Sequence, residues 1–191
     1  MKSICAFILL SAVIATPVLA AKKPAETRWA KEPDSFMGLR FDQKVDAALP
    51  ACPPGVGIQK QMCHEPPYTN LYTVRGGPPV GFGYSLSVFA GGAGVESFYL
   101  TTNSDNFSQL AALFTTKYGA PLSSTSEIVK TKGGASFTNE TLSWRGSKVS
   151  ITIQKFAGDI NTSAATISDI AATEKKAAER EAKTNSAASK L

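Results

Sequence analysis

Apolar and polar residues alternate along two stretches in the middle of the chain. Apolar residues occupy every second position over 82–88, and a returning segment over 95–102 follows the sequence AGGAG. A period of two is typical of a strand with one buried face, and a short glycine-rich turn joins two such strands into a hairpin. The segment 133–156 repeats this plan around Arg145-Gly146-Ser147. The sequence therefore predicts two β-hairpins, and a short strand over 163–170 that closes the sheet.

Helical spacing replaces this alternation over 104–121. Large apolar or aromatic residues lie three, seven and eleven positions after Phe107, which places them on one face of a helix. Ser104 or Asp105 is suited to cap its start, and Gly119 is suited to the left-handed conformation that ends a helix. The pattern predicts an amphipathic helix whose apolar face packs on the core.

A shorter unit of the same kind opens the domain. The apolar residues of 36–41 suit a short strand, and those of 45–49 recur at helical spacing. Asp42 is expected to cap this helix, and Pro50 is expected to end it. Both units therefore follow the order strand, cap, helix and proline.

The two ends of the chain differ in composition from the middle. Residues 21–35 are charged and interrupted by proline, so we expect a flexible arm from which Trp29 docks onto the domain. Residues 171–191 are rich in alanine and charge and lack a wide apolar stripe, which predicts a protruding helical tail. The single domain is therefore expected over 36–170.

Strands that occur in hairpins, without strand–helix–strand alternation, favour an antiparallel sheet with helices on one face. We therefore expect an α+β fold in which two hairpins and edge strands form the sheet. Two helices would cover one of its faces, and the C-terminal helix would protrude.

The opening of the domain also carries a resemblance to known families. The pattern F-x-G-L-x-F followed by V-x-x-x-L-P, over 36–50, is similar to the start of SmpA/OmlA-type envelope modules and of the beta-lactamase-inhibitor-like fold. The stretch F-x-x-L to K-Y-G-x-P, over 107–121, resembles uncharacterised proteobacterial periplasmic proteins. The resemblance implies helices packed on an antiparallel sheet and a role in binding other proteins, and it assigns no functional residue.

The N-terminus has the composition of a secretory signal peptide. Lys2 precedes a short apolar run, Pro17 interrupts it, and the sequence VLA follows. This run is shorter than the roughly 20 apolar residues that span a bilayer, so residues 1–20 are expected to be cleaved after Ala20. Because no second long apolar run follows, we expect a periplasmic or secreted protein that does not span the membrane.

Export would reduce the number of cysteines from three to two, because Cys5 is removed with the signal peptide. Cys52 and Cys63 then remain in an oxidising compartment, where a disulfide is the simplest state. Closing this loop should stabilise the fold by about 2–3 kcal/mol. Two alternatives stay open at this point: a metal site that uses Met62 or Glu65 beside the cysteines and His64, and a catalytic thiol. His64 is the only histidine of the chain and is expected on the surface of this loop.

No established catalytic motif accompanies these residues. A serine nucleophile usually needs a histidine base, which leaves His64 alone, although a serine–lysine pair stays possible. Paired carboxylates could cleave a glycoside, and Glu65, Glu96, Asp105 and Glu140 are the candidates. None of them has a distinctive sequence context, so no catalytic, metal or cofactor-binding residue is assigned.

The charge of the chain narrows the class of partner. The formal net charge is +5, or +4 once Lys2 is removed, which favours anionic partners in general. Basic residues are not interleaved with aromatic ones, which disfavours nucleic acid. The sequence thus predicts an exported, non-catalytic binding module without a cofactor, whose partner is an envelope protein or an anionic cell-wall component. The alternatives are a small envelope hydrolase that uses carboxylates, and a structural spacer that acts through the C-terminal helix.

Overall fold

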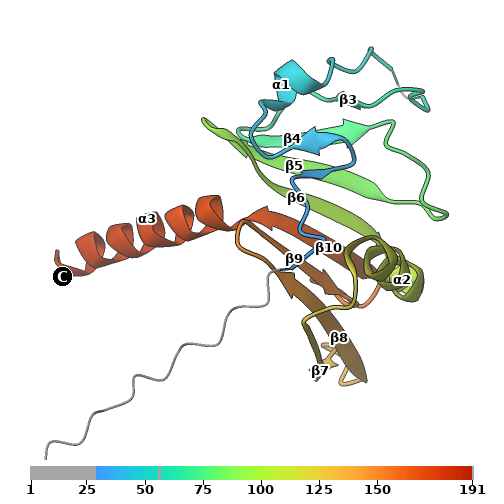
Figure 1. Ribbon diagram of the computed structural model, residues 1–191. Coiled ribbons are helices and arrows are strands. Elements are labelled where there is room, and N and C mark those ends of the chain that lie inside the picture. The colour runs from blue at the N-terminus through green and yellow to red at the C-terminus, as the bar shows by residue number, and fades with distance from the viewer. Residues whose placement is uncertain (1–28, 56, 191) are drawn as a thin grey trace, which may run out of the picture.

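An eight-stranded antiparallel sheet organises the chain in a computed structural model that describes residues 29–55 and 57–190 (Figure 1). A separate two-stranded hairpin and three helices complete the α+β fold within these residues. The predicted signal peptide, residues 1–20, lies outside the described residues, as does 21–28 of the expected arm.

The secondary structure follows the chain in an order dominated by hairpins. Its elements are β1 (Ser35–Phe36), β2 (Leu39–Arg40), α1 (Val45–Ala48), β3 (Cys63–His64), β4 (Leu71–Arg75), β5 (Ser85–Gly91), β6 (Gly94–Asn103), the 3-10 turn η1 (Ser104–Asn106), α2 (Phe107–Tyr118), β7 (Ser123–Lys130), β8 (Ser136–Arg145), β9 (Val149–Gln154), β10 (Thr162–Asp169) and α3 (Ile170–Ala188).

The strand order in the large sheet is β3-β4-β5-β6-β10-β9-β8-β7. Both predicted hairpins are present, as β5–β6 and β8–β9. The strand expected to close the sheet is instead its centre, because β10 pairs with β6 on one side and with β9 on the other. Ala165 and Ile167 of β10 are completely buried, so the last strand joins the two halves of the core.

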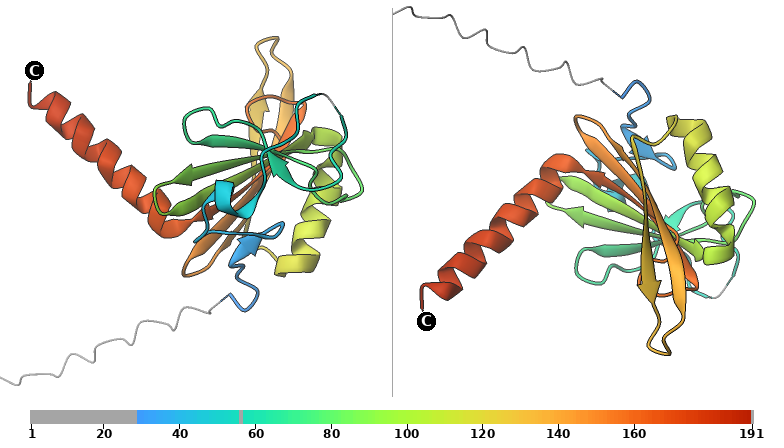
Figure 2. Two further views of the ribbon diagram at one scale, coloured as in Figure 1. Left: turned by 90° about the horizontal axis from the view of Figure 1, so that it is seen from above. Right: turned by 90° about the horizontal axis from the view of Figure 1, so that it is seen from below.

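The core lies on one face of this sheet. Alternate residues of β5, β6, β10 and β9 are buried there, and Phe107, Leu110, Phe114 and Tyr118 of α2 pack against them. The predicted apolar face of this helix is therefore confirmed. In Figure 2, α2 lies beside the sheet, whereas α3 runs away from it.

The N-terminal unit differs from its prediction in two respects. The expected single strand over 36–41 is a tight hairpin of β1 and β2, because Met37 and Gly38 both take positive φ values, of 48° and 86°. Two such residues in succession reverse a chain in a two-residue turn. Phe36 and Leu39 flank the turn and are buried in the core.

Asp42 does not cap the first helix. Its carboxylate accepts two hydrogen bonds from Arg40, both of 2.8 Å, and α1 begins three residues later with no side-chain cap. The charge-assisted pair with the neighbouring guanidinium replaces the capping interaction. The helix is correspondingly short.

Neither Ser104 nor Asp105 caps α2: both lie in the 3-10 turn η1, and the N-cap position of α2 is Asn106, which makes no side-chain cap hydrogen bond. The turn η1 is capped instead by Asn103. The Asn103 side chain accepts a hydrogen bond of 2.8 Å from the Asp105 amide. At the other end, Gly119 takes a positive φ of 88°, as predicted, but its ψ of −179° is extended and differs from that of the expected left-handed helical conformation.

Helix α3 leaves the sheet directly from β10. Asp169 caps it by accepting a hydrogen bond of 2.7 Å from the Ala172 amide, and only Ile170 is buried. The rest of the helix projects from the body (Figure 1), as the composition of the tail predicted. None of the helices in the described part of the chain is long and apolar enough to cross a bilayer.

Candidate functional site

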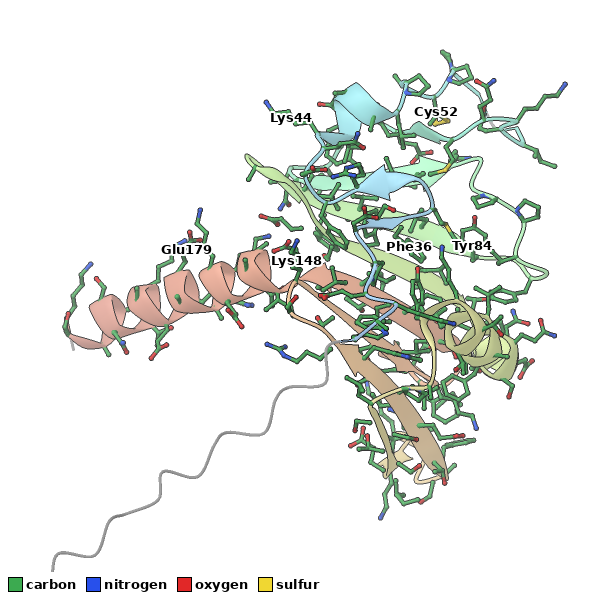
Figure 3. All side chains as sticks on the ribbon, in the orientation of Figure 1. Phe36, Lys44, Cys52, Tyr84, Lys148 and Glu179 are labelled. Carbon is green, nitrogen blue, oxygen red and sulfur yellow. A yellow bond between two sulfur atoms is a disulfide. The ribbon has the colours of Figure 1, made fainter. Side chains whose placement is uncertain are left out.

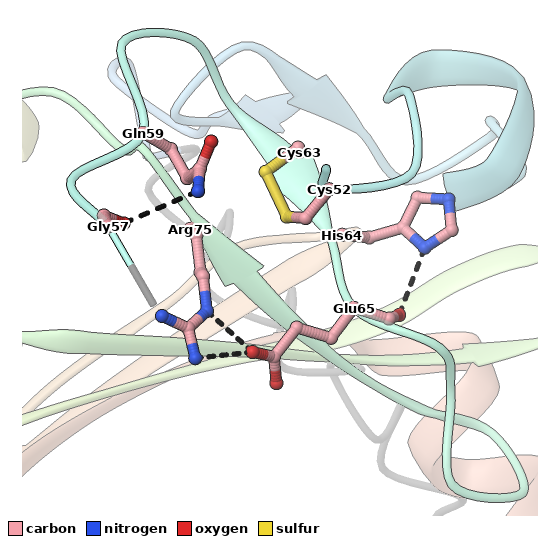
Figure 4. Close-up of a disulfide and its surroundings, with 7 residues drawn as sticks. All are labelled: Cys52, Gly57, Gln59, Cys63, His64, Glu65 and Arg75. Carbon is pink, nitrogen blue, oxygen red and sulfur yellow. Dashed lines mark hydrogen bonds and ion pairs between the residues drawn. A yellow bond between two sulfur atoms is a disulfide. The ribbon is translucent and has the colours of Figure 1, made fainter. Parts of the chain in front are cut away.

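The cysteine loop is closed by a disulfide between Cys52 and Cys63 (Figure 4). The bond joins the segment after α1 to edge strand β3, where His64 also bonds the backbone of Pro50 and Cys52, with N–O distances of 3.0 and 2.8 Å. The predicted disulfide is therefore confirmed. A disulfide offers no thiolate, so neither the catalytic thiol nor a cysteine-bound metal fits this loop.

His64 is buried, contrary to the expectation of a surface position. Its Nδ1 lies 3.0 Å from the Glu65 carbonyl oxygen, and its Nε2 lies 3.6 Å from Asp46. Its ring packs edge-on against Tyr72 with centroids 5.4 Å apart. Pairing of β3 with β4 turns this side chain inward, which its neighbouring prolines did not reveal.

The four carboxylates named from the sequence are distributed over separate elements. Glu65, Glu96 and Glu140 pair with Arg75, Lys176 and Lys155, respectively. Asp105 lies in the 3-10 turn before α2. Glu96 precedes Ser97, which pairs with Ser168 of β10, and Glu140 precedes Thr141, which pairs with Gln154 of β9. Because Ser168 and Gln154 lie toward opposite ends of the β9–β10 pair, the two glutamates lie toward opposite ends of the strands. No cluster of three metal-ligating side chains occurs within residues 29–55 and 57–190.

A cavity of about 840 Å³ lies at the base of α3. Four segments distant in sequence enclose it: the N-terminal hairpin, the β5–β6 turn, the β8–β9 turn and the first turns of α3. Its inner surface includes Phe41 and the buried side chains of Val95 and Val149. The volume is in the range of small-molecule and peptide sites.

Gly94 allows two of these segments to meet. It has a φ of 142°, and a Cβ placed on it would lie 2.4 Å from the Phe41 carbonyl oxygen. A side chain is therefore excluded both by the backbone conformation and by the neighbouring chain. This glycine fixes the β5–β6 turn against the N-terminal hairpin and so shapes the cavity.

The rim of the cavity carries charges of both signs in nearly equal number. The charged residues that line it are Arg40, Lys148, Lys175 and Lys176 together with Asp34, Asp42, Glu96, Asp169 and Glu179. Several neutralise one another, because Arg40 pairs with both Asp34 and Asp42, and Lys176 pairs with Glu96. Asp169 is the helix cap of α3.

Apart from Asp169, which caps α3, three charges of the rim remain without a counter-ion in the described part of the chain. Lys148, Lys175 and Glu179 form no ion pair within 4.0 Å there. Figure 3 places Lys148 at the base of α3 and Glu179 further along the helix. The cavity thus combines an apolar interior with a few available charges of both signs.

Glu32 holds the N-terminal segment over this cavity. One of its oxygens accepts hydrogen bonds from the amides of Lys148 and Val149, at 2.6 and 2.8 Å, and the other accepts one from the Ser147 hydroxyl at 3.0 Å. Burial alone would raise the pKa of Glu32, but these hydrogen bonds together lower it below its ordinary value. A Cβ on Gly146 would lie 2.3 Å from the carboxyl group, so glycine is needed there for Glu32 to dock.

Trp29 docks beside Glu32, as the sequence led us to expect. Its Nε1 donates a hydrogen bond of 2.8 Å to the Tyr118 carbonyl, and the two rings pack edge-on with centroids 6.2 Å apart. Residues 29–34 are therefore part of the folded body, and Pro33 and Asp34 reach the cavity rim.

Among the residues that line the cavity, Glu96 is the only one that the sequence suggested as a functional candidate. The other lining residues come from separate segments, and no short motif marks them. A comparison with protein-family models, with curated proteins and with solved structures finds no match. The fold and site therefore define an α+β domain with a cavity of mixed charge, and the resemblance to SmpA/OmlA-type and beta-lactamase-inhibitor-like modules stays a prediction.

Proposed function

We propose that this protein is an exported, non-catalytic binding module of the bacterial cell envelope, which holds a polypeptide segment of another envelope protein at the base of α3. The observation that carries the proposal is the cavity itself, with its apolar interior and its balanced rim. Peptides offer apolar side chains together with charges of both signs, so they complement such a surface.

The balance of charge also favours one of the two kinds of partner expected from the sequence. An anionic wall polymer would gain from Lys148 and Lys175 but would face Glu179 and the outer acidic groups. The overall positive charge of the chain is therefore not concentrated at this cavity. A polypeptide is the partner that the rim favours.

Export is supported by the N-terminal sequence and by the disulfide, which persists in an oxidising compartment. The intact mass of the protein tests both the cleavage of the signal peptide and the disulfide. Protein recovered from the envelope should begin at Ala21, lack two hydrogens, and react with a thiol reagent only after reduction. A chain that retains residues 1–20, or two free thiols, would contradict export.

The binding proposal can be tested with a library of synthetic octapeptides on the exported, full-length protein. Ala171 lines the cavity and is exposed, so Ala171→Trp should fill the cavity without disturbing the core. Ala182 is exposed further along α3, and Ala182→Trp is the matched control. We expect the wild type and the control to bind the same peptides, and Ala171→Trp to bind them at least tenfold more weakly.

Two results would overturn the proposal. One is a library in which no peptide binds the wild type. The other is binding that Ala171→Trp leaves unchanged, because the peptide would then lie elsewhere. Binding of polyphosphate, an anionic polymer without peptide bonds, in the absence of binding by any peptide would replace the polypeptide with an anionic polymer as the partner.

A further inference from the structure

In the four central strands, the face of the sheet opposite the core is covered mainly by uncharged polar side chains, and on the neighbouring strand β8 the same side carries Arg145, which pairs with Glu174. Strand pairing and alternating burial assign twelve residues of the four central strands to it. This hydroxyl face consists of Ser85, Ser87, Phe89, Ser97, Tyr99, Thr101, Ser150, Thr152, Gln154, Ala164, Thr166 and Ser168. None of the twelve carries a charge, although the chain has 35 residues of lysine, arginine, aspartate and glutamate.

The side-chain hydroxyls of this face are available for a ligand. Among the described residues, none of the ten polar side chains of the hydroxyl face forms a hydrogen bond with another protein group, whereas hydroxyls on the core side do. Ser163 donates to the Lys155 carbonyl at 2.7 Å, and Thr102 donates to the Gly83 carbonyl at 2.6 Å. Eleven of the twelve residues are partly or fully exposed, and only Ala164 is buried.

Two hollows lie at the two ends of the hydroxyl face. One, of about 390 Å³, is lined by Ser85, Thr101, Asn103 and other uncharged residues only. The second, of about 240 Å³, lies where Phe89 and Ser97 meet the first turns of α3, and Glu96, Lys176 and Arg180 add charges to its lining. The residues that line the two hollows lie four positions apart along β5 and β6, which is about 13 Å of strand.

Tyr99 lies midway between the two hollows. It pairs with Ser87 on one side and with Thr166 on the other, so an aromatic ring occupies the middle of a row of hydroxyls. Phe89 supplies a second ring at the α3 end. An extended polymeric ligand that lies along β5, β6 and β10 would therefore contact hydroxyls over its whole length and an aromatic ring at two positions.

We propose that the hydroxyl face binds a neutral glycan strand, which would run along these strands from one hollow to the other. Serine, threonine and tyrosine hydroxyls both donate and accept hydrogen bonds, as sugar hydroxyls do, and aromatic rings offer flat apolar surface to a sugar ring. None of the twelve residues lines the cavity, although the hollow at the α3 end shares Glu96, Ala172 and Lys176 with it, and the glycan proposal does not depend on the proposed function.

Other occupants fit the hydroxyl face less well. An anionic polymer finds no basic side chain among its twelve residues. A second sheet packed on this face would bury many hydroxyls without partners, and each unpaired hydroxyl costs about 1–3 kcal/mol. A glycan satisfies the hydroxyls without requiring charge.

The test uses the full-length protein and the N-acetylglucosamine hexamer as the probe, with insoluble chitin, a neutral polymer of the same sugar, as a second probe. Titration calorimetry compares the wild type with Tyr99→Ala and with Tyr68→Ala. Tyr68 is 83% exposed and lies outside both hollows, which makes it the matched control. We expect Tyr99→Ala to weaken hexamer binding at least tenfold and Tyr68→Ala to leave it within twofold.

Amide chemical shifts of the wild type provide a second measurement that does not depend on the folding of a variant. The hexamer should shift the amides of β5, β6 and β10 and leave those of α2 unchanged. The proposal is overturned if neither probe binds, if Tyr99→Ala and Tyr68→Ala have equal effects, or if the shifts occur elsewhere. Because Ala171→Trp does not touch this face, loss of peptide binding and loss of glycan binding are distinguishable.

Discussion

Replacement of Glu32 tests how the N-terminal segment is fastened to the domain. Glu32→Gln retains an oxygen for the amides of Lys148 and Val149 but removes the negative charge. Glu32→Ala removes all three hydrogen bonds to the β8–β9 turn. The two variants therefore separate the contribution of the charge from that of the hydrogen bonds.

The magnitudes follow from the number and the exposure of these bonds. A hydrogen bond to a charged group contributes about 1.5–3 kcal/mol when buried, and Glu32 is only partly buried. We therefore expect Glu32→Ala to lower the free energy of unfolding by about 2–3 kcal/mol at pH 7 and Glu32→Gln to lower it by about 1 kcal/mol.

The effect of the charge should depend on pH. The folded-state pKa of Glu32 lies below its ordinary value of 4.5, so the unfolded chain binds the proton more readily. The stability that the charge contributes is thus present above about pH 4.5 and is lost as the pH falls through the folded-state pKa. The wild type and Glu32→Gln should therefore converge in acid.

Urea unfolding followed by tryptophan fluorescence at pH 7 and near pH 3.5 measures the difference. Glu181→Gln on the exposed part of α3 serves as the control and should match the wild type at both pH values. If the difference between the wild type and Glu32→Gln is the same at both pH values, the hydrogen-bonded carboxylate is not its cause.

Three further predictions concern the core and the disulfide. Replacing both Cys52 and Cys63 by alanine should lower the free energy of unfolding by about 2–3 kcal/mol, and an unchanged urea midpoint would contradict this. Phe98 is completely buried, so Phe98→Ala should cost about 3–5 kcal/mol in the same assay, and a loss below about 1 kcal/mol would mean that the site is not packed as described. Burial raises the pKa of Tyr118 to about 12, and its hydroxyl has no hydrogen-bond partner among the described residues. Tyr118→Phe should therefore leave stability unchanged or raise it by up to about 1 kcal/mol, whereas a clear loss in thermal unfolding would reveal a partner.

Periodicity in the sequence was sufficient to predict the strands and helices that have one buried and one exposed face. The hairpins β5–β6 and β8–β9 and helix α2 are of this kind, so their apolar residues recur at the period of the element. Strand β7 was missed because it is an edge strand in which seven of the eight residues are exposed, so no alternation marks it. Strand β4 lies between segments rich in proline and glycine, and only Val74 is buried.

The central position of β10 in the sheet was missed for a different reason. Its pairing with β6 joins residues about 65 positions apart, as in Thr166 with Tyr99. Local pattern shows that a segment is a strand, but it does not show which strands flank it. The cavity depends on the same long-range pairing, because β10 carries α3 to the β5–β6 turn. For this reason the sequence did not predict that Lys148 and Lys175 line a common site.

The two proposed sites differ in charge, so salt distinguishes them within one protein. The cavity offers Lys148, Lys175 and Glu179 at its rim, and interactions of exposed charges weaken as the screening length falls from about 10 Å at 0.1 M salt to about 3 Å at 1 M. The twelve residues of the hydroxyl face carry no charge, and a neutral glycan gains no ion pair from the Glu96, Lys176 and Arg180 side chains that line the hollow at the α3 end. Peptide binding should therefore weaken several-fold over this range, while binding of the N-acetylglucosamine hexamer should change less than about twofold. Equal salt dependence of both ligands would mean that they share one site, and the separation of the two surfaces would then be wrong.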